Sequence, residues 1–103
     1  MQENNTLTDR QLAFMRRMKL TLIKQPNRLT HMQQLLKFLL DGKTITGLSA
    51  MRQMHIYRLS ARIHDLRAMG FLINTDRDPT NNAGRYTMSN DYRKALREIF
   101  NAM

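Results

Sequence analysis

Cysteine is absent from this chain of 103 residues, tryptophan is absent as well, and proline occurs only twice. Without cysteine there is no disulfide framework, no thiolate nucleophile and no cysteine-based zinc site. The polar residues 1–10 lack the apolar core of a signal peptide. The longest apolar stretch, residues 35–40, contains a lysine and is far too short to span a bilayer. We therefore expect a cytoplasmic protein without a membrane partner.

Acidic residues are also scarce. The sequence has 8 Asp and Glu against 17 Lys and Arg, which gives a formal net charge of +9. Such an excess attracts polyanions over long range, and nucleic acid is the commonest of these partners. Charge alone does not separate DNA from RNA, an anionic membrane or an acidic protein. A hydrophobic content of 42% excludes a disordered tail, and the length fits one domain with an appended helix at each end.

The residue patterns of common enzymes are missing. We find no Gly-rich phosphate loop, no nucleophile elbow and no pair of catalytic carboxylates. The three histidines, His31, His55 and His64, are too scattered in the sequence to predict a zinc site. We therefore expect no enzymatic activity, no cofactor and no metal, and the sequence gives no sign of a small-molecule effector.

Two threonines mark predicted helix starts. Thr8 and Thr30 are each followed three residues later by glutamine, the spacing of a capping box that satisfies backbone donors at a helix start. The first helix should end before Pro26, because the residue preceding proline disfavours helical geometry. The second should end at Asp41-Gly42, since glycine readily adopts the left-handed conformation that closes a helix.

Periodicity and turn residues predict a series of short helices and strands in the rest of the chain. Leu59, Ile63 and Leu66 fall on one face of the predicted helix at 57–69, at i, i+4 and i+7. In order, we predict a strand at 44–46, a helix to about 53, a turn at 54–56, a helix at 57–69, strands at 71–75 and 85–88 joined by a polar turn, and a helix from about 90. The predicted fold class is mainly α with a small β-hairpin.

Two segments of this pattern resemble a known family. Residues 42–46, Gly-Lys-Thr-Ile-Thr, and residues 58–70, Arg-Leu-Ser-Ala-Arg-Ile-His-Asp-Leu-Arg-Ala-Met-Gly, are similar to a winged helix-turn-helix family frequent in phage and prophage genes. The resemblance covers about residues 33–88, and it implies a winged-helix fold and DNA binding. The chain departs from the family at Ser60, where alanine is usual, and in the turn 54–56, which lacks the glycine often found there.

In a helix-turn-helix the second helix enters the major groove. Arg58 can place its planar guanidinium on a guanine edge, and Ser60 or His64 can contact base edges or phosphate. Small alanines would let the helix axis approach the bases. With the apolar face inward, at about 100° per residue, the outward positions of helix 57–69 are Tyr57, Ala61, His64 and Ala68, flanked by Arg58, Ser60 and Asp65. The alternative is an ordinary solvated helix face.

Further predicted DNA contacts flank this helix. Thr46, Ser49 and Arg52 belong to the supporting helix, whose N-terminal amides are a natural seat for phosphate. Arg77 and Arg85 flank the hairpin tip, where they would reach a minor groove or phosphates unless the hairpin only covers the core.

Arg62 lies nearer the edge of the core than the other basic residues of helix 57–69. It either pairs with Asp65 or Asp41, or it contacts DNA, and the sequence leaves both open. Arg67 lies on the side away from the groove, and we predict a structural role for it.

The apolar stripes of the two terminal helices bear on assembly. We divide the chain into a tail and helix at 1–26, a DNA-binding domain at 27–89 and a helix at 90–103. The domain needs one terminal helix to complete its core, so the other stripe predicts a homodimer, as is common for operator-binding proteins. The alternative is that both helices pack on their own domain.

The sequence therefore predicts a sequence-specific protein that binds double-stranded DNA, a transcriptional regulator or repressor of phage or prophage type. One alternative is an architectural or recombination accessory factor, such as an excisionase, which bends DNA. Another is a winged helix that binds protein, although Arg58 and Arg62 argue against it because an acidic face would be expected there. RNA binding is less favoured, since no aromatic cluster offers a stacking platform.

Overall fold

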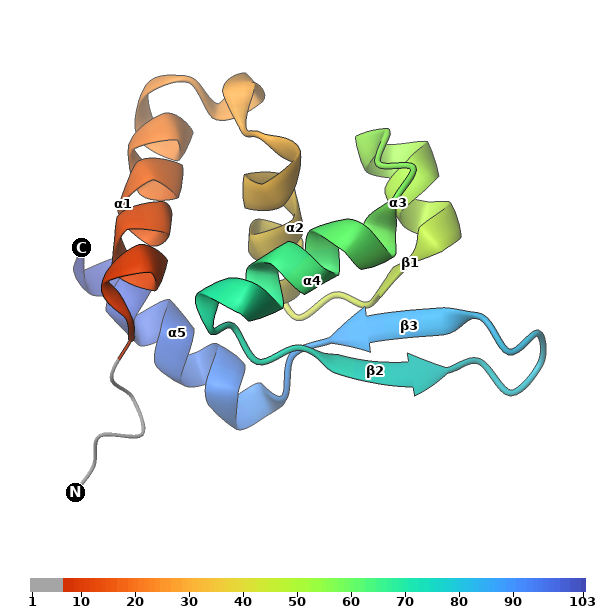
Figure 1. Cartoon of the computed structure of the whole chain (residues 1–103). Coiled ribbons are helices and arrows are strands. Elements are labelled where there is room, and N and C mark those ends of the chain that lie inside the picture. The colour runs from red at the N-terminus through yellow and green to blue at the C-terminus, as the bar shows by residue number, and fades with distance from the viewer. Residues whose placement is uncertain (1–6) are drawn as a thin grey trace.

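The computed structural model describes residues 7–103, which fold into helices with a small sheet at one edge (Figure 1). The elements are α1 (Asp9–Lys24), the short 3-10 helix η2 (Pro26–Arg28), α2 (His31–Leu40), β1 (Ile45–Thr46), α3 (Gly47–Met54), α4 (Leu59–Met69), β2 (Asn74–Arg77), β3 (Gly84–Thr87) and α5 (Asn90–Ala102). The predicted class, mainly α with a β-hairpin, is confirmed, and β1 extends the hairpin to a three-stranded sheet.

The helix starts follow the capping residues. Thr8 and Thr30 each accept a hydrogen bond from the backbone of the glutamine three residues later, and that glutamine side chain accepts one from the threonine amide. Both predicted capping boxes are therefore present. Gly42 closes α2 with a φ of 84°, the left-handed conformation that glycine adopts without strain. These caps hold α2 and its flanking segments in fixed positions.

The sheet is antiparallel in the order β1-β3-β2. Ile45 of β1 pairs with Tyr86 of β3, and Tyr86 pairs in turn with Thr75 of β2. In Figure 1 the β2–β3 hairpin and its loop extend away from the helices. This hairpin is the wing of the fold.

The predicted strand at 71–75 is wrong in its position. Strand β2 begins at Asn74, and its four residues are exposed and polar. Phe71 and Ile73 are buried instead in the connection that precedes it, where they complete the core. The Ile73 carbonyl accepts two hydrogen bonds from Arg67, at 3.2 Å from Nε and 2.6 Å from Nη2, so it does not join the ladder. The apolar run is thus a core-facing linker, and Arg67 is structural, as the sequence predicted.

Both terminal helices pack on the central core. Met15 and Met18 of α1 are fully buried, and Leu96 of α5 is nearly so. The Lys19 ammonium of α1 donates to the carbonyl of Phe100 at 2.7 Å and lies over its ring, which joins the two helices. Within residues 7–103, no helix is both long and apolar enough to cross a bilayer.

Candidate nucleic-acid interface

The turn between α3 and α4 sets the angle of the candidate reading helix. His55 adopts a left-handed conformation with a φ of 57°, and its amide donates to the Met51 carbonyl at 3.2 Å. Ile56 follows it, donates to the Ala50 carbonyl at 3.1 Å and is buried in the core. Histidine visits this conformation more readily than most residues other than glycine. The turn therefore forms without a glycine.

Helix α4 begins at Leu59, two residues later than predicted. Tyr57 is 72% exposed and precedes the helix, and Arg58 occupies the N-cap with backbone angles that are not helical. The left-handed turn and the buried Ile56 account for the later start of α4, because the chain needs two residues to leave the core before it can begin a helix. Tyr57 and Arg58 therefore project from the N-terminal end of α4 and not from its side.

The face that α4 turns to solvent is small and polar. Leu59, Ile63 and Leu66 are buried, which confirms the predicted inward face. Ser60, His64 and Ala68 are exposed and lie four residues apart, so they form one stripe along the helix. Ala61, predicted to point outward, is half-buried at the border of this stripe. The exposed stripe and Arg58 at its end are the surface that we consider for base contacts.

Arg62 forms an ion pair within α4. Its Nη2 lies 3.1 Å from the Asp65 carboxylate, while Asp41 pairs with Lys37 at 2.9 Å instead. Both partners in the Arg62 pair are over 40% exposed. Exposed pairs contribute little to stability, so a phosphate can replace the carboxylate at small cost. The pair thus leaves Arg62 available to DNA.

The supporting helix α3 starts at a third capping box. Thr46 Oγ1 accepts from the Ser49 amide at 3.1 Å, and Ser49 Oγ accepts from the Thr46 amide at 3.0 Å. The two hydroxyls therefore satisfy the helix start itself and leave the N–H groups of Gly47 and Leu48 to point beyond it. Arg52 is exposed in the last turn of the same helix. The first turn of α3 contains no carboxylate, so its positive helix end is not neutralised there.

The two wing arginines are engaged within the hairpin. Arg85 Nη2 lies 2.6 Å from the Asp76 carboxylate, and Arg77 Nη1 donates to the Asn82 carbonyl at 3.0 Å. The Arg77 backbone amide and then the Arg85 guanidinium hold the pKa of Asp76 below its ordinary value. The amide of Thr80 has the same effect on the pKa of Asp78. The wing therefore carries little net positive charge near its tip.

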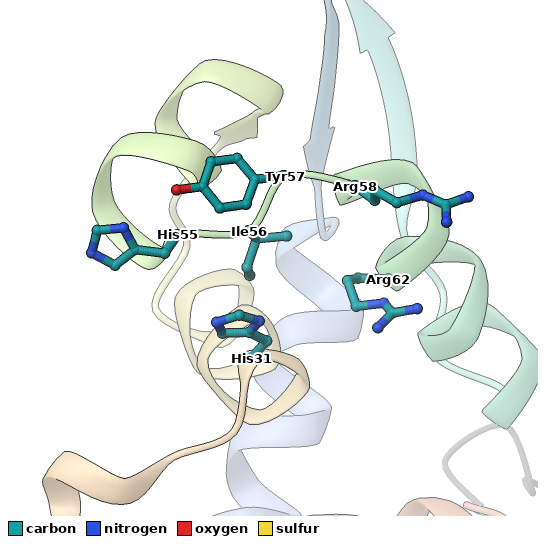
Figure 2. Close-up of a pocket in the computed structure, with 6 residues that line it drawn as sticks. All are labelled: His31, His55, Ile56, Tyr57, Arg58 and Arg62. Carbon is teal, nitrogen blue, oxygen red and sulfur yellow. The ribbon is translucent and has the colours of Figure 1, made fainter.

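Sequence reasoning missed one basic hollow beside this interface. Its volume is about 360 Å³, and Figure 2 shows the His31 ring of α2 below Ile56, with the Arg58 and Arg62 side chains on the same side of the turn. The lining residues are His31, His55, Ile56, Tyr57, Arg58 and Arg62. His31 is 24 or more positions from the others in the sequence, so only the fold brings them together. Its one sequence signal is Thr30, which places His31 at the first position of a helix.

Comparison with known proteins supports this description. A family model described as a winged helix-turn-helix domain matches residues 30–91, more than half of the chain. The match runs from the N-cap of α2 into the first turn of α5, so α1 and most of α5 lie outside it. Neither a curated protein nor a solved structure matches the chain significantly.

Proposed function

We propose that this protein, which belongs to the winged helix-turn-helix domain family, is a sequence-specific regulator that reads double-stranded DNA with α4. Membership of the family indicates DNA binding, and the net charge of +9 favours a polyanionic partner. One observation carries the finer proposal. Helix α4 is anchored by a buried apolar face and presents Ser60, His64 and Ala68 on the opposite side, with Arg58 at its N-terminal end.

The side chains on this surface suit the major groove. The groove is about 12 Å wide and admits an α-helix, and small residues such as Ala68 permit close approach of the helix axis. Arg58 reaches from the leading end of α4, where it can donate two hydrogen bonds to guanine O6 and N7. Ser60 and His64 follow Arg58 along α4, where they can reach neighbouring base edges. The proposed readers are thus Arg58, Ser60 and His64.

Residues around α4 would hold the DNA backbone. The free amides at the start of α3, together with Arg52, are suited to a phosphate on one side of the groove. On the wing, Arg77 and Arg85 would have to leave Asn82 and Asp76 before they contact phosphate. We therefore propose that α3 contributes more to backbone binding than the wing does.

A homodimer is the assembly that we propose for operator binding. Leu20 and Ile23 of α1 are 54% and 69% exposed, and with Met103 they line an apolar groove of about 260 Å³. Exposed apolar side chains in one groove support an interface between copies, and two copies would place two α4 helices on a palindromic site. In this proposal residues 27–89 bind DNA in the cytoplasm, and the protein serves as a regulator of phage or prophage type.

Selection of bound sequences from a random pool of duplexes tests the proposal. We expect an enriched motif of a few base pairs, repeated with two-fold symmetry at about 10 base pairs centre to centre if the protein pairs its subunits. Enrichment without a motif, accompanied by DNA bending, would favour an architectural or recombination factor. Retention of no duplex at low salt would contradict DNA binding altogether.

A further inference from the structure

The basic hollow beside α4 opens where the N-terminus of α2 meets the turn between α3 and α4 (Figure 2). Its six lining residues include two histidines and two arginines but no Asp or Glu. A surface of this composition, contributed by three separate parts of the chain, favours an anion.

Backbone donors add to the charge of the hollow. The capping box at Thr30 satisfies the amides of Thr30 and Gln33, whereas the next two amides, of His31 and Met32, have no hydrogen-bond partner within residues 7–103. Neither α2 nor α4 has an acidic residue in its first turn, and the N-cap of α4 lacks a side-chain hydrogen bond. Two helix starts with unneutralised positive ends therefore lie at one hollow.

Arg62 supplies an independent indication of a missing acceptor. Its Nε is buried and has no hydrogen-bond partner in the described part of the chain, although its Nη2 reaches Asp65. A buried donor without an acceptor costs free energy, and an oxygen entering the hollow would relieve that cost. A phosphate can accept from Nε and Nη together, in the two-point geometry that guanidinium favours.

We propose that this hollow seats one backbone phosphate of the bound duplex, held by His31 and Arg62. The proposal rests on the proposed function, because it assigns a contact at the same interface. The hollow is open to solvent and directly adjoins the first residues of α4, so an occupant would lie on the wall of the groove that α4 enters. A phosphodiester within a duplex fits this position without having to enter an enclosed site.

The two imidazoles add hydrogen-bonding groups to this hollow. The titratable and charged groups that line it are His31 from α2, His55 and Arg58 from the turn, and Arg62 from α4, with Asp65 paired to Arg62. Of these, we assign His31 and Arg62 to the phosphate, since Arg58 is proposed to reach a base.

The test uses His31→Gln and Arg62→Gln in the full chain, with Lys94→Gln on the exposed side of α5 as a matched loss of one charge. Affinity for duplexes of random sequence is measured over a salt series, with thermal melting as the control for folding. We expect each hollow variant to bind every sequence more weakly, and Arg62→Gln to reduce the salt slope by about one. Lys94→Gln should retain the wild-type slope.

Asp65→Asn separates phosphate binding from a structural role of Arg62. If Arg62 binds phosphate, loss of its internal partner leaves the salt slope at the wild-type value or raises it. If Arg62 acts only through its pair with Asp65, this variant will reproduce the defect of Arg62→Gln, and that result would overturn the proposal.

A titration with inorganic phosphate, followed by NMR, distinguishes the source of the anion. Shifts at the His31 and Met32 amides together with weakened DNA binding by the variants support the backbone phosphate. Shifts without any change in DNA binding would overturn it in favour of a free phosphate. Unchanged affinity in both hollow variants, with an unchanged slope in Arg62→Gln, would also overturn it while leaving the proposed function intact. A wild-type protein that binds no duplex would refute both.

Discussion

Replacement of Arg58 by alanine should separate reading of bases from binding of the backbone. The Arg58 side chain makes no ion pair and no hydrogen bond within residues 7–103, and its position at the N-cap of α4 involves no side-chain capping bond. The fold therefore does not depend on the guanidinium. A change in DNA affinity on this substitution reports the loss of a DNA contact.

The expected magnitude follows from the geometry of a bidentate contact. Two hydrogen bonds to one guanine are worth about 1–3 kcal/mol of discrimination, or roughly 5- to 150-fold in affinity for the selected site. His64→Ala should have the same character and a smaller effect, since an imidazole does not offer the paired donors of a guanidinium. Affinity for random DNA should fall much less in both variants, because nonspecific binding depends on phosphates.

Both duplexes have to be measured at one salt concentration, by fluorescence anisotropy, with Arg85→Ala beside them. Arg85 is held by Asp76 and faces no base in the proposal, so any loss in this variant should be equal on both duplexes. If Arg58→Ala loses the same factor on the selected and the random duplex, α4 is not the reader, although the fold assignment would remain.

Three further predictions concern charge, assembly and the wing. A dimer with six to eight phosphate contacts should give a slope of log affinity against log salt of roughly −5 to −7, and a curve that barely moves between low and physiological salt would contradict polyanion binding. Deletion of residues 1–25 removes the buried Met15 and Met18, so melting temperature should fall and light scattering should report a monomer; a fragment that stays dimeric would exclude α1 as the interface. Because the pKa of Asp76 is lowered in the fold, its contribution to the hairpin is present above its ordinary value and is lost as pH falls through the lowered one. Amide shifts of the wing should therefore move only below about pH 4, and movement confined to pH 5–8 would refute this.

Local rules predicted the helical part of the fold well. Thr8 and Thr30 with their glutamines fixed two helix starts, and the spacing of Leu59, Ile63 and Leu66 identified the buried face of α4. Each of these signals acts over one or two turns of chain. Short-range chemistry is enough to decide them.

Elements that depend on distant partners were harder to place. The apolar residues Phe71 and Ile73 look like a strand in the sequence, but the pairing with β3 begins only at Asn74. Tyr57 and Arg58 fit the period of α4, yet the conformation of His55 keeps them outside it. In both cases the ladder or turn, which a hydrophobic pattern does not encode, set the boundary.

The residues of the candidate site also divide into those that the local sequence predicts and those that only the fold brings together. Ser60, His64 and Arg58 were predicted from one helix and its likeness to a family, and all three are exposed in the structure. His31 and His55 were dismissed as scattered because only the packing of α2 against the turn brings them to one hollow. A grouping made by tertiary contacts has no signature in a single sequence.

The central claim is that α4 enters the major groove, and base analogues in the selected site test this claim most directly. Replacement of one guanine at a time by 7-deazaguanine removes the N7 acceptor from the major groove, while inosine removes the amino group from the minor groove. We predict that 7-deazaguanine at the position read by Arg58 weakens binding about as much as Arg58→Ala does, and that inosine there changes little. Sensitivity to inosine with indifference to 7-deazaguanine throughout the site would contradict the account.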